Sequence, residues 1–176
     1  MDIIEVEEVG AIDQRYTIEG LDFIASGNQY LTFTLGNEHY AVDILCVREI
    51  RGWEPPTLVP NVPKHIKGVI NLRGTIVPII DLRIQFSIGE VTYLPTTVVI
   101  VLTNESTDRP RTMGYIVDAV SDVLNAEDSD IKKAPAFAST IQPHYIDGLV
   151  NSGEKVITLL NIESLQNLEL DKVNND

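Results

Sequence analysis

The residue types that most often carry out chemistry are scattered along this chain of 176 residues. The three histidines, His39, His65 and His144, do not have the spacing of metal ligands. Cys46 is the single cysteine, so a zinc site is not expected. No glycine-rich loop leads into a helix, and no Gly-Xaa-Ser-Xaa-Gly motif is present. We therefore predict no catalytic residue, no cofactor and no metal, and interpret the chain as a binding module.

Arg73 is the strongest single candidate for a binding residue. It stands in the turn Asn71-Leu72-Arg73-Gly74, between two apolar segments of the stretch 65–82. An arginine presented by a tight glycine turn can make forked hydrogen bonds to a carboxylate. Two plainer interpretations stay open, a solvated loop arginine or an internal ion pair with Glu49 or Asp81.

The overall charge argues against several classes of partner. The formal net charge is −13, and tight binding to nucleic acid or anionic membranes depends on Lys and Arg. Six of the thirteen basic residues nevertheless lie between Arg48 and Arg83, around the candidate turn. No apolar run reaches the roughly 18–20 residues of a membrane span, and the acidic N-terminus is unlike a signal peptide. We expect a cytoplasmic protein that binds neither nucleic acid nor the membrane interior.

Alternating apolar residues predict mainly strands. Residues 29–43 form a predicted hairpin around Gly36-Asn37, and Met113–Val120 form a strand that continues over 121–124. Asp43, Asp81 and Asp118 stand at predicted strand ends, where capping or turn roles are the commoner explanation. The sequence predicts a turn of helix at 82–86, a C-terminal helix over 162–170 that packs back on the strands, and an acidic flexible tail over 1–27.

An internal repeat organises these elements. Residues 97–102 match 30–35, and a run from Ile146 to Leu160 matches Ile66 to Ile80 without a gap. Gly68 and Gly148 coincide, which indicates positions where a side chain would not fit or where φ is positive. The repeat predicts an all-β fold of two tandem five-stranded β-barrels, one over 28–86 and one over 95–161. Arg73 belongs to the first copy only, since Gly153-Glu154 stands at the matching turn.

Several motifs together resemble one known family over about residues 28–168. They are Val42-Asp43-Ile44, Glu49-Ile50-Arg51-Gly52, Asn71-Leu72-Arg73-Gly74, Val77-Pro78-Ile79, Asp81-Leu82-Arg83 and Val117–Leu124. In these features the chain resembles the CheW-like family of chemotaxis coupling proteins. The resemblance implies SH3-like barrels and an adaptor without catalytic activity. It implies a free monomer in the cytoplasm that joins membrane receptor arrays.

The resemblance also implies partners and contact residues. The partners are the cytoplasmic tip of a methyl-accepting chemoreceptor and the regulatory domain of the histidine kinase CheA; the alternative is a CheW-like scaffold in a different, non-flagellar array. The matching receptor- or kinase-binding positions are Val47, Glu49, Gly68, Arg73, Gly74, Val120 and Gly148. Two features depart from the family pattern: the long, charged Thr103–Thr112 loop and the acidic tail.

Overall fold

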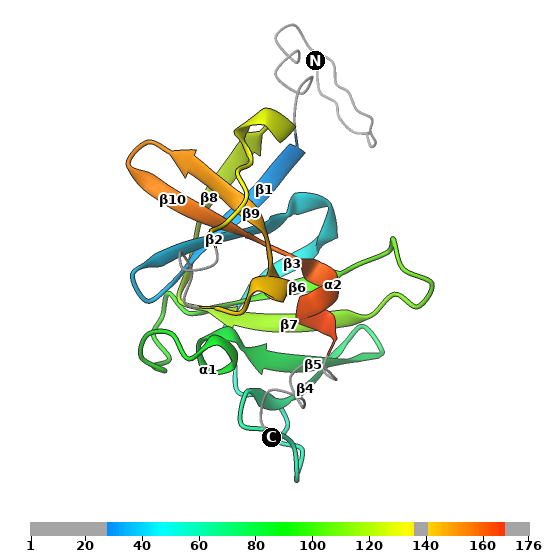
Figure 1. Ribbon diagram of the computed structural model, residues 1–176. Coiled ribbons are helices and arrows are strands. Elements are labelled where there is room, and N and C mark those ends of the chain that lie inside the picture. The colour runs from blue at the N-terminus through cyan, green and yellow to red at the C-terminus, as the bar shows by residue number, and fades with distance from the viewer. Residues whose placement is uncertain (1–27, 136–140, 168–176) are drawn as a thin grey trace, which may run out of the picture.

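Strands dominate the computed structural model, which describes residues 28–135 and 141–167 (Figure 1). Within these residues ten strands form two five-stranded sheets, with the orders β8-β1-β2-β10-β9 (the first sheet) and β3-β6-β7-β5-β4 (the second sheet). The strands are β1 Asn28–Leu35, β2 Glu38–Asp43, β3 Val47–Gly52, β4 Ile66–Leu72, β5 Thr75–Asp81, β6 Val98–Thr103, β7 Thr112–Val117, β8 Ala119–Ala126, β9 Ile146–Ser152 and β10 Lys155–Leu160. The helices are α1 Leu82–Phe86 and α2 Ile162–Gln166, with 3-10 turns η3 Ile44–Cys46, η4 Asp128–Asp130 and η5 Pro143–Tyr145. The predicted all-β class is confirmed.

The repeat appears in the order of the elements. Strands β1–β5 and helix α1 correspond one by one to strands β6–β10 and helix α2. When each strand is replaced by its counterpart in the other half, the strand order of the first sheet becomes that of the second. The two halves of the sequence therefore build two equivalent sheets.

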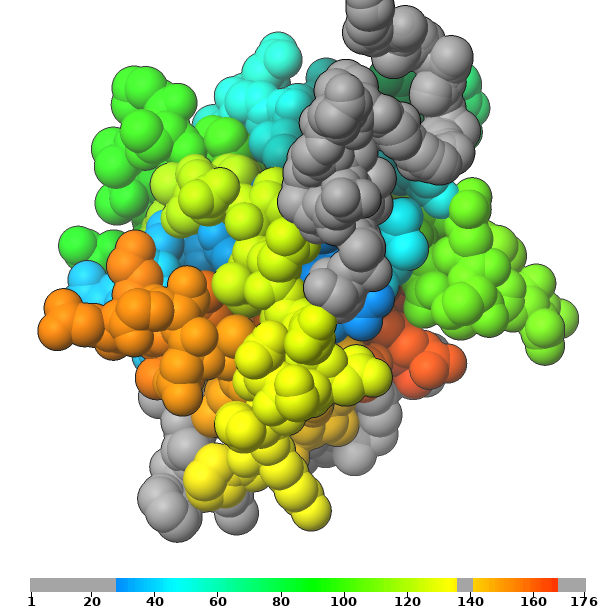
Figure 2. Space-filling model, turned by 90° about the horizontal axis from the view of Figure 1, so that it is seen from above, coloured from blue at the N-terminus to red at the C-terminus, as the bar shows by residue number. Residues whose placement is uncertain are grey.

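The predicted ranges of the two barrels, 28–86 and 95–161, do not match the pairing of the strands. Neither 28–86 nor 95–161 forms a sheet by itself: the first sheet takes β1 and β2 from the first half and β8, β9 and β10 from the second. Four strand pairs join the halves: the antiparallel pairs β1 with β8 and β3 with β6, and the parallel pairs β2 with β10 and β5 with β7. In Figure 2 the blue segments of the first half lie beside the yellow and orange segments of the second. A sequence repeat does not reveal this exchange, because each strand has the same apolar pattern whichever copy it pairs with.

Asp118 marks one of the points where the chain changes sheets. The single strand predicted over Met113–Leu124 is two strands, since β7 ends at Val117 and β8 begins at Ala119. The Asp118 N–H donates to the Thr34 carbonyl (3.1 Å), and the Gly36 N–H donates to Asp118 Oδ2 (2.6 Å). Backbone and side chain of one aspartate thus tie the end of the second sheet to the β1–β2 hairpin of the first.

The two edge strands of each sheet are joined by a short extended segment. Thr57, which follows β3, exchanges two hydrogen bonds of 2.9 Å with Val69 of β4. Lys132, which follows β8, makes the equivalent pair with Leu149 of β9 at 2.8 Å. Each sheet thereby curls until its edges are covered. This agrees with a barrel, while the SH3-like assignment stays a prediction.

Three apolar clusters follow from the alternation of side chains along the strands. The shared core lies between the sheets and includes Leu31, Phe33, Ile100 and Leu102 from β1 and β6. The first-sheet cluster contains Ala41, Ala126, Val150, Ile157 and Leu159. The second-sheet cluster contains Val77, Ile79, Val99, Val101 and Ile116, and Ile70 packs against it.

The structure describes only part of the two chain ends for which the sequence made predictions. The acidic tail predicted over 1–27 lies outside the described residues. Helix α2 begins at Ile162 as predicted but ends at Gln166, where Asn167 is the C-cap, and residues 168–170 of the predicted helix lie outside the described part. The Asn161 side chain accepts a hydrogen bond from the Ser164 N–H (2.8 Å) and so caps the start of this helix.

Candidate functional site

The β4–β5 hairpin presents Arg73 at its tip. The two residues between the strands, Arg73 and Gly74, have φ of 50° and 88°, the positive pair that a type I′ turn requires. The Gly74 N–H donates to Asn71 Oδ1 at 2.8 Å, which holds the turn from below. Arginine is an unusual choice here because the left-handed region favours glycine or asparagine.

The Arg73 side chain is 77% exposed and pairs with Glu49. Its Nη2 donates to Glu49 Oε1 at 2.9 Å, while Arg51 Nη1 lies 3.6 Å from Glu49 Oε2. Because Glu49 and Arg51 are on β3 and Arg73 is on the opposite edge of the second sheet, the row bridges the two sheet edges. We call Arg73, Glu49 and Arg51 the charge row. Glu49 is one of the two ion-pair partners predicted for Arg73. The other, Asp81, bonds Arg83 instead.

Stability alone does not explain an arginine at this position. An exposed ion pair contributes about 0–1 kcal/mol, whereas a left-handed conformation costs a side-chain-bearing residue roughly 1–2 kcal/mol. A conformational cost that the folded chain does not offset by its own contacts is typical of a functional position. The structure therefore brings together Arg73, Gly74 and Glu49 as one exposed surface.

Two of the predicted contact residues lie apart from each other. Val47 is on β3 near Glu49, opposite Leu102, and Val120 is on β8 of the first sheet, opposite Phe33. Both valines are half-buried and pack against the shared core. Only Val47 shares a strand with the charge row.

Gly68 and Gly148 occupy equivalent close approaches next to a bulge. A Cβ on Gly68 would clash with the backbone carbonyl oxygen of Thr57, and its φ is 146°. A Cβ on Gly148 would lie 2.5 Å from Ile131 Cγ2 and 3.1 Å from the Lys132 carbonyl oxygen. Both glycines thus allow the extended segment to cover the edge strand, as the repeat predicted. Their part in binding stays a prediction.

A buried ion network was missed at the sequence level. Arg83 is 1% exposed, and its guanidinium bonds both oxygens of Asp81 (3.0 Å each) and Asp118 Oδ1 (2.9 Å). Burial alone would lower the pKa of Arg83, but the hydrogen bonds and charges of Asp81 and Asp118 outweigh it and raise that pKa. The only hint in the sequence was the pairing of a strand-end aspartate with an arginine two residues later.

The connector between the halves, which contains Thr92 and Tyr93, makes hydrogen bonds to the same network. Arg83 Nη1 donates to the Thr92 carbonyl (2.7 Å), and the Tyr93 hydroxyl donates to Asp81 Oδ2 (3.1 Å). The Tyr93 ring stacks on Trp53 with centroids 4.3 Å apart. Burial, followed by the charge and hydrogen bond of Asp81, raises the pKa of Tyr93 to about 12.

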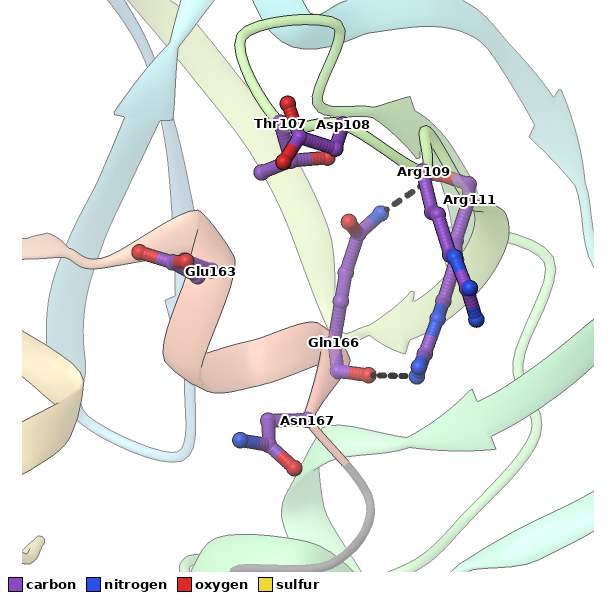
Figure 3. Close-up of a pocket in the computed structure, with 7 residues that line it drawn as sticks. All are labelled: Thr107, Asp108, Arg109, Arg111, Glu163, Gln166 and Asn167. Atoms are coloured by element: carbon purple, nitrogen blue, oxygen red, sulfur yellow. Dashed lines mark hydrogen bonds between the residues drawn. The ribbon is translucent and has the colours of Figure 1, made fainter.

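The charged loop 104–111 borders a polar groove that shares no residue with the charge row (Figure 3). The groove has a volume of about 360 Å³ and separates the loop from α2. Gln166 Nε2 donates to the Arg111 carbonyl (2.9 Å), and Arg111 Nη1 returns a bond to the Gln166 carbonyl (3.1 Å). The lining contains two arginines, Arg109 and Arg111, and two acidic residues, Asp108 and Glu163, so its charges balance. The loop projects from one side of the molecule in Figures 1 and 2.

Neither a metal-binding cluster nor a membrane-spanning helix occurs in the described residues. Within residues 28–135 and 141–167, no three His, Cys, Asp or Glu side chains lie close enough together to bind a metal ion. In the same part of the chain, no helix has the length and apolar character needed to cross a membrane.

The fold is that of a double-sheet β-protein with an exposed charged hairpin. Comparisons with known proteins show its family. The CheW-like domain model matches residues 29–169. The chain is 49% identical over 143 residues to a Klebsiella aerogenes protein named Chemotaxis protein CheW, covering 81% of this chain and 84% of that protein. It is 35% identical over 139 residues to the protein of that name from Rhizobium meliloti, covering 79% of this chain and 87% of that protein.

A solved structure supports the same conclusion. The scaffolding protein TtCheW from Thermoanaerobacter tengcongensis superposes with a TM-score of 0.70 at 30% identity, covering 77% of this chain and 85% of that one. The matched domain spans nearly all of the described residues. The chain belongs to the CheW-like domain family.

Proposed function

We propose that this chain is a non-catalytic chemotaxis coupling protein. It joins the cytoplasmic tip of a chemoreceptor to the regulatory domain of the histidine kinase CheA, in the cytoplasm beneath a membrane receptor array. Family membership supports this proposal, as do the relatives named Chemotaxis protein CheW and the neighbour titled a scaffolding protein. The free chain is expected to be a monomer.

The observation that carries the proposal is the exposed Arg73 in a left-handed turn. Its guanidinium uses one nitrogen to bond Glu49, and the bond from the Gly74 N–H to the Asn71 side chain stabilises the turn that carries it. The remaining N–H groups can make forked hydrogen bonds to a carboxylate of a partner. When a partner excludes water from the charge row, each of these bonds strengthens, because the local dielectric constant falls.

The test is Arg73→Glu, measured by ternary assembly with CheA and a receptor tip fragment and by receptor-dependent kinase activity. The variant places a carboxylate beside Glu49 and removes the donors, so we expect assembly to weaken by about tenfold or more. Arg73→Asn is the matched variant, because asparagine tolerates the left-handed turn and removes the charge without reversing it. It should fall between the wild type and Arg73→Glu.

A charge swap separates a binding role from an internal one. In the double variant Arg73→Glu with Glu49→Arg, the ion pair is restored with its partners exchanged. Binding should remain weak if Arg73 or Glu49 contacts a partner, and it should recover if the pair only ties the hairpin to β3. Unchanged assembly and kinase activity in Arg73→Glu would remove Arg73 from the interface. Failure of the wild-type chain to bind either partner would reject the proposed function.

The other predicted contacts fit this proposal in different ways. Gly74 supports it through the turn, and Val47 lies on the strand that carries Glu49. Val120 would belong to a second contact on the first sheet. Gly68 and Gly148 would affect binding through the fold, because side chains there meet the covering segments.

A further inference from the structure

The single tryptophan of the chain stacks on a tyrosine of the connector between α1 and β6. The Trp53 and Tyr93 rings have centroids 4.3 Å apart and planes inclined by 17°. The other ring pairs among the described residues involve Phe33, Tyr40, Phe86, His144 and Tyr145. Tyr93 is 38% exposed, so this stack lies at the surface of the protein.

The Tyr93 ring is held on more than one side. Its hydroxyl donates to Asp81 Oδ2 at 3.1 Å, and Arg83 Cζ lies 5.2 Å from the ring centroid, the geometry of a cation–π contact. The carbonyl of the preceding residue, Thr92, accepts a bond of 2.7 Å from Arg83 Nη1. The buried ion network therefore fixes the ring on which Trp53 stacks.

Trp53 continues the face of β3 that carries the charge row. Its N–H donates to the Thr97 carbonyl at 3.1 Å, which extends the pairing of β3 with β6 one residue beyond Gly52. Because side chains alternate along a strand, Glu49, Arg51 and Trp53 lie on one face, and all three are half-buried. The Trp53 ring packs against the second-sheet cluster. It is the next side chain after Arg51 along this face.

The same network is fixed to the first sheet. Arg83 Nη1 also donates to Asp118 Oδ1 (2.9 Å), and Asp118 Oδ2 accepts from the Gly36 N–H (2.6 Å). Gly89 of the connector lies against this β1–β2 turn, since a Cβ built on Gly36 would be 3.3 Å from Gly89 Cα. The connector thus touches the first sheet at Gly36 and the end of β3 at Trp53.

Arg51 is not fixed by its own ion pair. Its Nη1 lies 3.6 Å from Glu49 Oε2, longer than a hydrogen bond, and its side chain is 34% exposed. Exposed ion pairs of this kind contribute little. A neighbour that restricts a long side chain before binding reduces the entropy lost when a partner arrives. Trp53 is placed to restrict Arg51 in this way.

We propose that Tyr93 is a positioning residue for the charge row, which acts through Trp53 to hold Arg51 in its binding orientation. The connector thereby sets the charge row relative to the first sheet. The proposal deepens the proposed coupling function and rests on it for the binding measurement, whereas the orientation of Arg51 is measured without any partner.

The first test uses the free full-length chain. Fluorotryptophan at Trp53 gives one fluorine NMR signal, and the side-chain N–H signal of Arg51 is followed in the same samples. Tyr93→Leu removes the stack and should shift both signals, while Tyr93→Phe keeps the ring and should shift them less. Leu94→Ala, at the next connector residue, which is 57% exposed, is the matched control and should shift neither. A shifted fluorine signal with an unchanged Arg51 signal in Tyr93→Leu would overturn the proposal.

The second test measures ternary assembly with CheA and a receptor tip fragment. Tyr93→Leu should weaken assembly by about two- to tenfold, the effect of immobilising one long side chain on binding, while Tyr93→Phe and Leu94→Ala stay within about twofold of the wild type. In an Arg51→Gln background, Tyr93→Leu should have no further effect. An equal loss in both backgrounds would overturn the proposal, because Tyr93 would then act independently of Arg51.

A measurement on the wild-type chain keeps the proposal testable if Tyr93→Leu does not fold. The fluorine signal of Trp53 is recorded as the unlabelled partners are added, and we expect it to shift together with the Arg51 signal. An Arg51 signal that moves while the Trp53 signal stays unchanged at saturation would overturn the link between them. No assembly of the wild-type chain would instead contradict the proposed function.

Discussion

The β4–β5 and β9–β10 hairpins have the same register and different tips. Asn71 pairs with Ile76 in the first, and Asn151 pairs with Val156 in the second. Arg73 and Gly74 both have positive φ, whereas in the other tip Gly153 alone has it, at 64°. The repeat therefore preserves what builds the sheet and changes the residues at the exposed tip. Positions where equivalent elements differ are the places to look for function in a duplicated fold.

The helices that follow these hairpins show a second difference, this time inside the protein. The Asp81 and Asn161 N–H groups donate to the His65 and Tyr145 carbonyls at 2.7 Å in both cases. The residue two positions later is the buried Arg83 in α1 and the exposed Glu163 in α2. The first half thus contains an ion network where the second half has a neutral cap.

The largest expected effect comes from breaking that network. Arg83→Met leaves Asp81 and Asp118 without their shared cation, and removing one partner of a buried ion pair costs about 3–5 kcal/mol. Glu163→Met, at the equivalent position of α2, should change the free energy of unfolding by less than about 0.5 kcal/mol. Urea denaturation of both variants measures the difference. Similar values for the two would show that the network contributes no more than a surface side chain.

The two equivalent glycines should differ in the same assay. In Gly68→Ala the new methyl group meets the rigid Thr57 backbone at positive φ, so we expect a loss of about 2–4 kcal/mol. In Gly148→Ala the nearest neighbour is the γ-methyl group of Ile131, a side chain rather than backbone, and φ is not positive, so the loss should be smaller, about 1–3 kcal/mol. Gly52→Ala, with open space around it, is the control. A larger loss at Gly148 would mean that Ile131 is held more tightly than the Thr57 segment.

The connector offers a comparison between two pH ranges. The pKa of Tyr93 is raised from 10.0 to about 12, so the folded state favours the neutral phenol that donates to Asp81. Its contribution to stability is therefore fully present below pH 10 and is lost as the pH rises from 10 toward 12. Unfolding midpoints of wild type and Tyr93→Phe should differ at pH 9 and converge above pH 11. Parallel curves would show that the hydroxyl does not stabilise the connector.

Residue patterns predicted where the strands lie more readily than which strands pair with each other. The alternation in 29–43 and the repeat of Gly68 at Gly148 predicted strands and close approaches that the structure contains. Alternation says which residues face a core, but it does not say which core. The passage of the chain between sheets at Asp118 therefore could not be predicted. The sequence indicates one strand over Met113–Leu124, where the structure has two.

The charge row was only partly predictable for a related reason. The sequence indicated Glu49 and Asp81 as alternative ion-pair partners of Arg73, and the structure shows Glu49. Arg51 was missed because its role depends on the approach of the two sheet edges through Thr57.

The smallest expected change in the free energy of unfolding comes from exchanging residues at the two hairpin tips. Arg73→Gly relieves the left-handed strain but removes an exposed ion pair and makes the unfolded chain more flexible, so the free energy of unfolding should stay within about 1 kcal/mol of the wild type. Gly153→Arg introduces that strain at the other tip and should cost about 1–2 kcal/mol. Partner binding should show the reverse order, weak for Arg73→Gly and unchanged for Gly153→Arg. If Arg73→Gly instead lost several kcal/mol, the arginine would be a structural residue, and the difference between the tips would reflect folding rather than recognition.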